Sequence, residues 1–179
     1  MNKKPAVLLD RDGTLIVDRI YLNDPNKIEY LPGVFQALRL LRDRGFAFSV
    51  VTNQSGVPRG LVDVRNLEEI HRRIQAQFAS EGVDILSFHS APYMTDFAHP
   101  ARKPNPGMLL EAAQWYNYDL TKSWMVGDRL TDVEAGHRAG ARSALVGTSP
   151  GPASEERFRP PEIHAPNLLE VAQEILTRL

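Results

Sequence analysis

Short runs of apolar residues recur along the chain, and several of them end at a polar or charged position. The run at residues 6–9 ends at Asp10, and the run at residues 47–51 ends at Thr52. Runs that are apolar on both faces are typical of strands buried in a parallel sheet. The pattern therefore predicts strands over Ala6–Leu9, Ala47–Val51, Ile85–Phe88, Trp124–Val126 and Ala144–Val146.

Longer stretches between these runs repeat their apolar residues at helical spacing. Val34, Leu38 and Leu41 share one face of a predicted helix, which stops near Gly45, a residue that suits a left-handed helix end. Further along, Thr131 and Glu134 have the spacing of a capping box. The predicted helices cover Val34–Arg44, Val64–Ser80, Gly107–Tyr116, a segment from Thr131 to about Gly140, and Leu168–Leu179.

The alternation of strands and helices predicts an α/β fold, in which a doubly wound parallel sheet carries helices on both faces. The proline-rich stretch Ser149–Pro166 is typical of a surface loop, and the single helix after it is too little for a second domain. A chain of 179 residues falls within the usual range of one domain. We therefore predict one domain over residues 1–179.

The composition excludes several classes of protein. Because the chain has no cysteine, disulfides, thiolate metal sites and a cysteine nucleophile are excluded. Its 21 basic and 22 acidic residues leave a net charge of −1, which argues against an overall basic nucleic-acid binder. We find neither a signal-peptide pattern nor an apolar run of membrane-spanning length. We expect a cytoplasmic monomer that binds neither nucleic acid nor membranes.

The candidate chemistry lies where the predicted strands end. In an open α/β sheet, ligands bind beyond the carboxyl ends of the strands. Asp10 and Asp12 follow the first strand, Thr52 follows the second, Asp128 follows the fourth, and Lys103 precedes a helix. This combination of carboxylates, a hydroxyl group and a cation is suited to phosphoryl transfer.

Each of these side chains has a role in such a reaction. A carboxylate such as Asp10 can attack phosphorus and form an aspartyl-phosphate. A second carboxylate, Asp12, can protonate the leaving oxygen and later take a proton from water. Mg²⁺ prefers oxygen ligands, so Asp10 and Asp128 are candidate metal ligands. Lys103 and Thr52 are candidates for binding the phosphoryl oxygens.

Together these segments resemble the four motifs of the haloacid dehalogenase (HAD) superfamily of phosphatases. The motifs are DRDGT at 10–14, TNQSG at 52–56, RKP at 102–104 and GD at 127–128, in the order of the superfamily. The longer sequences VVTNQSG and RKPNPGML, and the pair Arg59-Gly60, are similar to those of D-glycero-D-manno-heptose 1,7-bisphosphate 7-phosphatases. Histidinol-phosphate phosphatases are close relatives that share many of these residues.

The resemblance implies removal of the C7 phosphate of a heptose bisphosphate through an aspartyl-phosphate, in lipopolysaccharide precursor biosynthesis. It implies that Asp10 is the nucleophile and a Mg²⁺ ligand, and that Asp128 is another ligand. Asp12 is then the general acid/base and gives its backbone carbonyl to the metal, while Thr52 and Lys103 hold the phosphoryl group. The residues expected to contact the sugar phosphate substrate are Asp18, Arg19, Ile20, Tyr21, Asn53, Gln54, Ser55, Arg59, Arg102 and Arg129.

One common feature of this family is absent. Many members carry a zinc loop of three cysteines and a histidine between the second and third motifs, whereas residues 90–101 contain no cysteine. Because His89 and His99 alone cannot form a closed zinc site, we predict no zinc and a loop that is ordered by packing. The spacing of the motifs leaves no room for a separate cap domain. We therefore expect an open site beneath a flap near Asp18–Tyr30.

Other functions remain open on the sequence. A histidinol-phosphate phosphatase is the nearest alternative, and a non-catalytic phosphate-binding protein of the same fold is an alternative of another class. DNA 3′-phosphatase activity is disfavoured because no basic stripe is present. Among single residues, we expect Asp132 to support Lys103 rather than bind metal, and Arg11 to be structural or solvated. The histidines expected at the surface are His71, His137 and His164.

Overall fold

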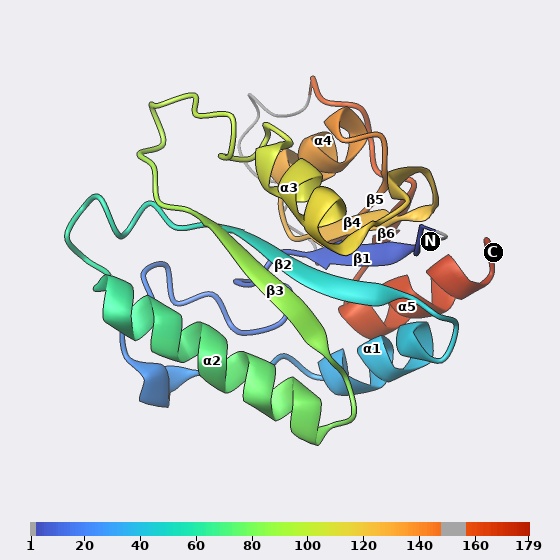
Figure 1. Cartoon of the computed structure of the whole chain (residues 1–179), viewed down its shortest axis with the longest axis horizontal. Helices are drawn as coiled ribbons and strands as arrows, with labels where there is room; N and C mark the ends of the chain where they lie inside the picture. The colour runs from blue at the N-terminus through green and yellow to red at the C-terminus, as the bar shows by residue number, and fades with distance from the viewer. Residues whose placement is uncertain (1–2, 148–156) are drawn as a thin grey trace.

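The computed structural model describes residues 3–147 and 157–179, and its strands form one central sheet between two layers of helices (Figure 1). All neighbouring strands run parallel, in the order β3-β2-β1-β4-β5-β6. The strands are β1 (Ala6–Leu9), β2 (Ala47–Asn53), β3 (Ile85–Ala91), β4 (Trp124–Gly127), β5 (Arg142–Val146) and β6 (Ile163–Ala165). The predicted parallel α/β sheet is confirmed.

Helices cover both faces of this sheet, as the doubly wound arrangement requires (Figure 1). One face carries α1 (Val34–Arg42), α2 (Val64–Ser80) and α5 (Leu168–Leu176). The other face carries α3 (Gly107–Tyr116) and α4 (Leu130–Arg138). Two 3-10 helices, η1 (Pro25–Lys27) and η2 (Leu120–Lys122), lie in the connections. Between β1 and α1 the chain holds η1 but no cap domain.

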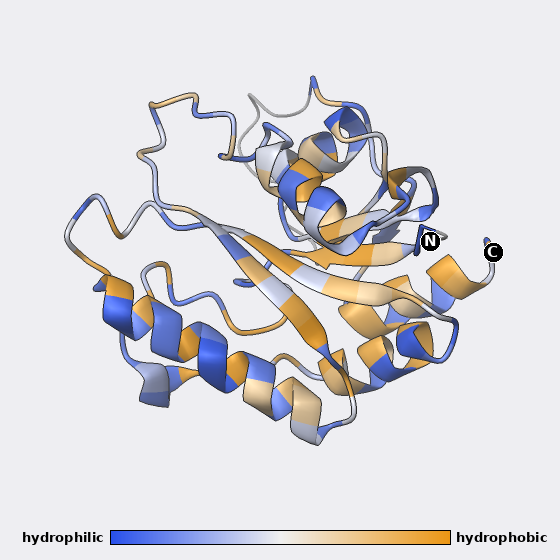
Figure 2. Ribbon diagram, in the orientation of Figure 1, coloured by the Kyte–Doolittle hydropathy of each residue, from blue (hydrophilic) through white to orange (hydrophobic). Residues whose placement is uncertain are grey.

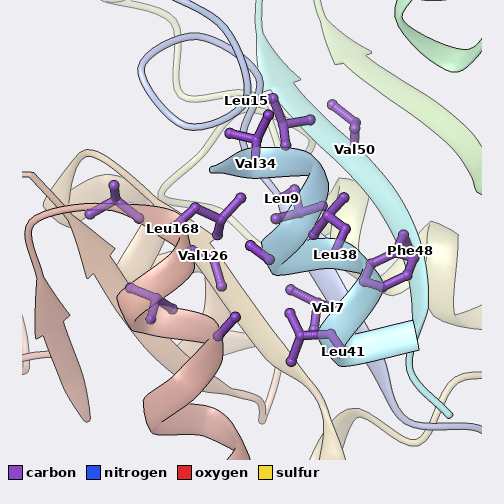
Figure 3. Close-up of a cluster of buried hydrophobic side chains, with 14 of the residues drawn as sticks. Val7, Leu9, Leu15, Val34, Leu38, Leu41, Phe48, Val50, Val126 and Leu168 are labelled. Atoms are coloured by element: carbon purple, nitrogen blue, oxygen red, sulfur yellow. The ribbon is translucent and has the colours of Figure 1, made fainter. Parts of the chain in front are cut away.

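Strand β1 divides its side chains between the two cores of the protein. Val7 and Leu9 pack toward α1 and α5 (Figure 3), whereas Ala6 and Leu8 belong to the cluster beside α3. All of them are completely buried. Figure 2 shows the strands as largely apolar and the helices as mixed, because a strand covered on both faces meets water on neither.

The predicted ends of β2, β3, α1 and α5 and the start of β5 differ from the observed ones by two or three residues, and two further predictions are wrong. Residues 163–165, predicted as surface loop, form β6, whose alternate residues Ile163 and Ala165 are buried. Helix α4 begins at Leu130, and the carboxylate of Asp132, not Glu134, accepts a hydrogen bond of 3.0 Å from the backbone N–H of Arg129. Residues 148–156 of the predicted loop lie outside the described residues.

The strand order places a topological switch point between β1 and β4. From this point the chain winds in opposite directions, which leaves a crevice at the carboxyl ends of these two strands. Asp10 and Asp128 follow β1 and β4 directly. The described elements share one sheet, which supports our proposal of a single domain. No helix among the described residues is both long and apolar enough to cross a membrane.

Candidate active site

Three carboxylates meet at the switch point, and we call Asp10, Asp128 and Asp132 the acid cluster. One oxygen atom from each lies within 4.8 Å of the others. Two glycines allow this approach, because a Cβ at Gly13 would collide with the Asp128 carboxylate and a Cβ at Gly127 with the Asp132 carboxylate. Gly13 also has a φ of +77°, a conformation that other residues rarely adopt.

The acid cluster has the chemistry of a divalent-cation site. Its donors are carboxylate oxygens, the ligands that Mg²⁺ prefers. Asp128 Oδ1 is buried and has no hydrogen-bond partner among the described residues. Burial and the negative charges of Asp10 and Asp132 raise the pKa of Asp128 to about 8. A bound cation would supply the missing partner and the missing positive charge, so these residues fit the metal that the sequence predicts.

Lys103 lies buried against the acid cluster. Its Nζ donates hydrogen bonds of 2.8 Å to Asp10 Oδ1 and 2.8 Å to the carbonyl of Val51, and it pairs with Asp132 Oδ1 at 2.6 Å. Burial by itself would lower the pKa of Lys103, but Asp10 and Asp132 outweigh it and raise this pKa. The ammonium group is therefore charged, and the prediction that Asp132 supports Lys103 is confirmed.

The last residue of β2, Asn53, and the residue after it, Gln54, hold Lys103 and Thr52 in place. Asn53 Oδ1 accepts a hydrogen bond of 3.0 Å from the backbone N–H of Lys103, and its Nδ2 donates one of 3.1 Å to the Lys103 carbonyl. Gln54 Nε2 donates to Thr52 Oγ1 at 2.9 Å and to Asp12 Oδ2 at 3.2 Å. Thr52 keeps its own hydroxyl proton for a further acceptor. Asn53 and Gln54 thus have protein partners, and their substrate contacts stay a prediction.

Asp12 has a different environment from Asp10. Arg11, only 1% exposed, donates hydrogen bonds of 2.9 to 3.2 Å from Nε and Nη2 to both carboxylate oxygens of Asp12. Burial raises the pKa of Asp12, the charge of Arg11 opposes this shift, and Asp10 adds to it. The net result is a raised pKa, which favours a carboxyl group that can donate a proton.

Arg11 also contacts helix α2 through His71. Its Nη1 lies 3.0 Å from His71 Nε2. The surface position that we predicted for His71 is wrong, since its side chain is only partly exposed and contacts the buried Arg11. A signal for this was present in the sequence, because His71 follows Leu67 by four residues and precedes Ile74 by three, the spacing of one buried helix face.

The lowered pKa of His71 predicts an acid-sensitive contribution to stability. Burial and the charge of Arg11 lower the pKa of His71 from 6.5 to about 3. Between these values the unfolded chain binds a proton here that the folded protein does not, so stability falls as the pH falls below about 6.5. Between pH 7 and pH 5 the free energy of unfolding of the wild type should fall because His71 titrates in the unfolded chain. Glutamine does not titrate, so the fall in His71→Gln should be smaller, by up to about 2 kcal/mol. Urea unfolding at both pH values measures this difference, and equal losses would contradict it.

A cleft of about 780 Å³ opens beside the acid cluster. Its wall contains most of the predicted site residues: Asp10, Asp12, Asp18, Ile20, Tyr21, Asn53, Ser55, Arg102, Lys103 and Arg129. The remaining predicted residues, Arg19, Thr52, Gln54, Arg59 and Asp128, are not in this wall. The wall also includes Phe97, Arg138 and Phe158, which our sequence-based prediction missed because they lie in no recognisable motif.

The flap contributes Ile20 and Tyr21 to the cleft. Ile20 is 80% exposed and has a φ of +67°, which is rare for a β-branched residue. Asp18 Oδ1 accepts a hydrogen bond of 2.7 Å from the Ile20 N–H and so stabilises this turn. Arg19 instead pairs with Glu29 at the surface.

Positive charge gathers at the rim of the cleft. Burial and the neighbouring charge of Arg59 lower the pKa of Arg102. Over residues 3–147 and 157–179, neither arginine forms an ion pair, and their partners are the carbonyl of Tyr93 for Arg102 and the hydroxyl of Thr95 for Arg59. Guanidinium groups without a carboxylate partner are suited to an anionic ligand.

The loop between β3 and α3 is built on stacked rings. The rings of Tyr93 and His99 stack at 3.7 Å with an interplanar angle of 16°, and Phe97 lies 5.9 Å from His99. His99 Nδ1 accepts a hydrogen bond of 3.1 Å from the backbone N–H of Ala101. The prediction that this loop is ordered by packing is confirmed.

Comparisons with known proteins agree with this geometry. The HAD-hydrolase-like family matches residues 100–171. A D-glycero-beta-D-manno-heptose-1,7-bisphosphate 7-phosphatase from Photorhabdus laumondii is 36% identical over 151 residues, which are 80% of this chain and 78% of that protein. The protein of the same name from Escherichia coli (strain K12) is 38% identical over 151 residues, 80% of this chain and 76% of its own.

A solved structure is similar over nearly the whole chain. It is the D,D-heptose 1,7-bisphosphate phosphatase from B. bronchiseptica, complexed with magnesium and phosphate. Its TM-score to this chain is 0.86, with 31% sequence identity over 98% of this chain and 99% of that one.

Proposed function

Because the chain belongs to the D-glycero-beta-D-manno-heptose-1,7-bisphosphate 7-phosphatases, a family of HAD-type phosphoric monoester hydrolases, we propose that it removes the C7 phosphate of this heptose bisphosphate. The observation that carries the proposal is that one cleft joins a phosphoryl-transfer site at Asp10 and Lys103 to a positive rim at Arg102. A bisphosphate can present one phosphate to each. We also propose that the protein is a monomer in the cytoplasm and that it acts in the synthesis of lipopolysaccharide precursors.

In the first proposed step, a carboxylate oxygen of Asp10 attacks the phosphorus atom of the C7 phosphate. The bond between phosphorus and the C7 oxygen breaks, and Asp12 donates its proton to that oxygen. The products are an aspartyl-phosphate on Asp10 and a heptose with a free C7 hydroxyl group. The raised pKa of Asp12 supports its role as the acid.

In the second step, water attacks the phosphorus atom of the aspartyl-phosphate. Asp12, now ionised, takes a proton from this water, the bond between phosphorus and Asp10 breaks, and inorganic phosphate leaves. The Lys103 ammonium group and the Thr52 hydroxyl group donate hydrogen bonds to the phosphoryl oxygens in both steps. Arg102, Arg59 and Arg129 bind the second phosphate at the rim.

We propose that Asp10, Asp128 and the backbone carbonyl of Asp12 hold Mg²⁺. The unpartnered oxygen of Asp128 and the close approach of Asp10 support this site. When bound, Mg²⁺ offsets the repulsion between the Asp10 carboxylate and the phosphate dianion. Lys103 alone cannot do so, because Asp132 already shares its charge.

Removal of the metal is expected to abolish turnover. EDTA-treated protein should release phosphate at least about 100-fold more slowly, and added Mg²⁺ should restore the rate. Without substrate, Mg²⁺ should raise the Tm of the wild type, because it binds only the folded acid cluster. Asp128→Asn should lose this rise, whereas Asp84→Asn, which removes an exposed acid outside the cluster, should keep it. Full turnover in EDTA would show that the metal assignment is wrong.

The substrate proposal is tested by kcat/KM for heptose 1,7-bisphosphate, heptose 7-phosphate and histidinol phosphate. We expect the bisphosphate to be preferred, because its second phosphate meets the arginine rim. Arg102→Met should lower this preference over heptose 7-phosphate by about tenfold, since one charged hydrogen-bonding contact is lost. Preference for histidinol phosphate would favour that alternative. No phosphate release from any of the substrates would favour a non-catalytic phosphate-binding protein.

A further inference from the structure

We propose that His71 of helix α2 is a positioning residue, which holds the guanidinium group of Arg11 and through it the general acid/base Asp12. The inference rests on the proposed function, because the role of Asp12 is assigned there. His71 belongs to none of the four motifs, and it lies 60 positions from Arg11 in the chain.

The Arg11 guanidinium group has a partner on each of its nitrogen atoms. Nε and Nη2 donate to both oxygens of Asp12, and Nη1 lies 3.0 Å from His71 Nε2. Because the guanidinium group is planar and rigid, the contact on Nη1 limits how far the other two nitrogens can turn away from the carboxylate. Arg11 is only 1% exposed, so the loss of a hydrogen-bond partner would leave a buried donor of its guanidinium group unsatisfied.

The geometry defines the state of His71. Arginine carries only hydrogen-bond donors, so His71 Nε2 must accept, and the ring must be neutral with its proton on Nδ1. The ring is held on its face as well, because it stacks on Phe88 of β3 at 4.6 Å with an interplanar angle of 21°. Helix α2 and strand β3 thereby fix the acceptor that Arg11 needs.

Asp12 depends on this support for its placement. Gln54 Nε2 also donates to Asp12 Oδ2, but at 3.2 Å and with Thr52 as a second acceptor. Arg11 therefore makes most of the hydrogen bonds that hold the Asp12 carboxylate in place. A general acid must lie within hydrogen-bond reach of the leaving oxygen, and small misplacements are costly. Loss of the acceptor at position 71 should impair proton donation more than the attack by Asp10.

Leaving-group dependence tests this directly. Heptose bisphosphate releases an alcohol that must be protonated, whereas p-nitrophenyl phosphate releases a stable phenolate that needs little acid catalysis. His71→Leu and His71→Ala should lower kcat/KM about tenfold or more for heptose bisphosphate and less than about threefold for p-nitrophenyl phosphate. His71→Gln, which can offer an oxygen acceptor near the position of Nε2, should retain both values within about threefold.

Matched controls separate positioning from a merely structural role. Glu68→Leu places the same residue at an exposed site on α2 and should leave both substrates unaffected. Thermal unfolding checks every variant, and if the leucine variant does not fold, the alanine variant decides. Equal losses on the two substrates, or a glutamine variant as impaired as the leucine variant, would overturn the proposal.

Failure of the proposed function gives a different pattern. The wild type would then hydrolyse p-nitrophenyl phosphate but not heptose bisphosphate. In that case glycerol 2-phosphate, which also releases an alcohol, would replace heptose bisphosphate when the His71 variants are compared with the wild type. A selective loss with glycerol 2-phosphate would support the role of His71 even then. A wild type that hydrolyses none of these substrates would overturn both proposals.

Discussion

Replacement of Asp10 by asparagine is expected to lower kcat by about 10⁴-fold or more while the protein still folds. A carboxamide is too weak a nucleophile to form the phosphorylated intermediate, although it is nearly isosteric with the carboxylate. Its oxygen can still accept the hydrogen bond that Lys103 Nζ makes to Asp10 Oδ1 at 2.8 Å. The variant also removes the repulsion between the Asp10 and Asp128 carboxylates, so the loss in unfolding free energy should be small.

Two measurements check this result. Phosphate release in Mg²⁺ buffer gives kcat, and mass spectrometry of acid-quenched wild type should find phosphate on the peptide that contains Asp10. Asp84→Asn is the matched control, because it makes the same chemical change at an exposed position and should retain full activity. Turnover of Asp10→Asn within about tenfold of the wild type would exclude Asp10 as the nucleophile.

Lys103→Met is expected to lower both activity and stability. The ammonium group that binds the phosphoryl oxygens is lost, which should lower kcat/KM by about 10³-fold. Asp10 and Asp132 would also be left as buried charges without their cation, which should lower the free energy of unfolding by about 3–5 kcal/mol. Steady-state kinetics and urea unfolding measure the two effects.

A double variant separates these two roles of Lys103. In Lys103→Met/Asp132→Asn, one of the stranded charges is removed, and the asparagine can still accept the hydrogen bond from the Arg129 N–H. We expect the double variant to regain part of the unfolding free energy but none of the activity. Recovery of activity in the double variant would mean that Lys103 acts only by neutralising Asp132.

The sequence by itself determined the architecture and the candidate catalytic residues that we propose. Continuous apolar runs mark strands that are covered on both faces, and β1, β2 and β4 lie where these runs occur. Asp10, Thr52 and Asp128 could be placed at one edge without coordinates, because the carboxyl ends of parallel strands share an edge. By contrast, β6 has only three residues, and its pattern is too short to distinguish a strand from a loop before it pairs with β5.

Only the tertiary structure decided which polar groups pair with each other. Asn53 meets the backbone of Lys103, and Arg11 meets His71, across 50 and 60 positions of the chain. A motif shows which residues reach the active edge, but it does not show how α2 packs on β3 or which donor finds which acceptor. Hydrogen bonds act over about 3 Å, so their partners are set by the packing of whole elements and not by neighbours in the chain.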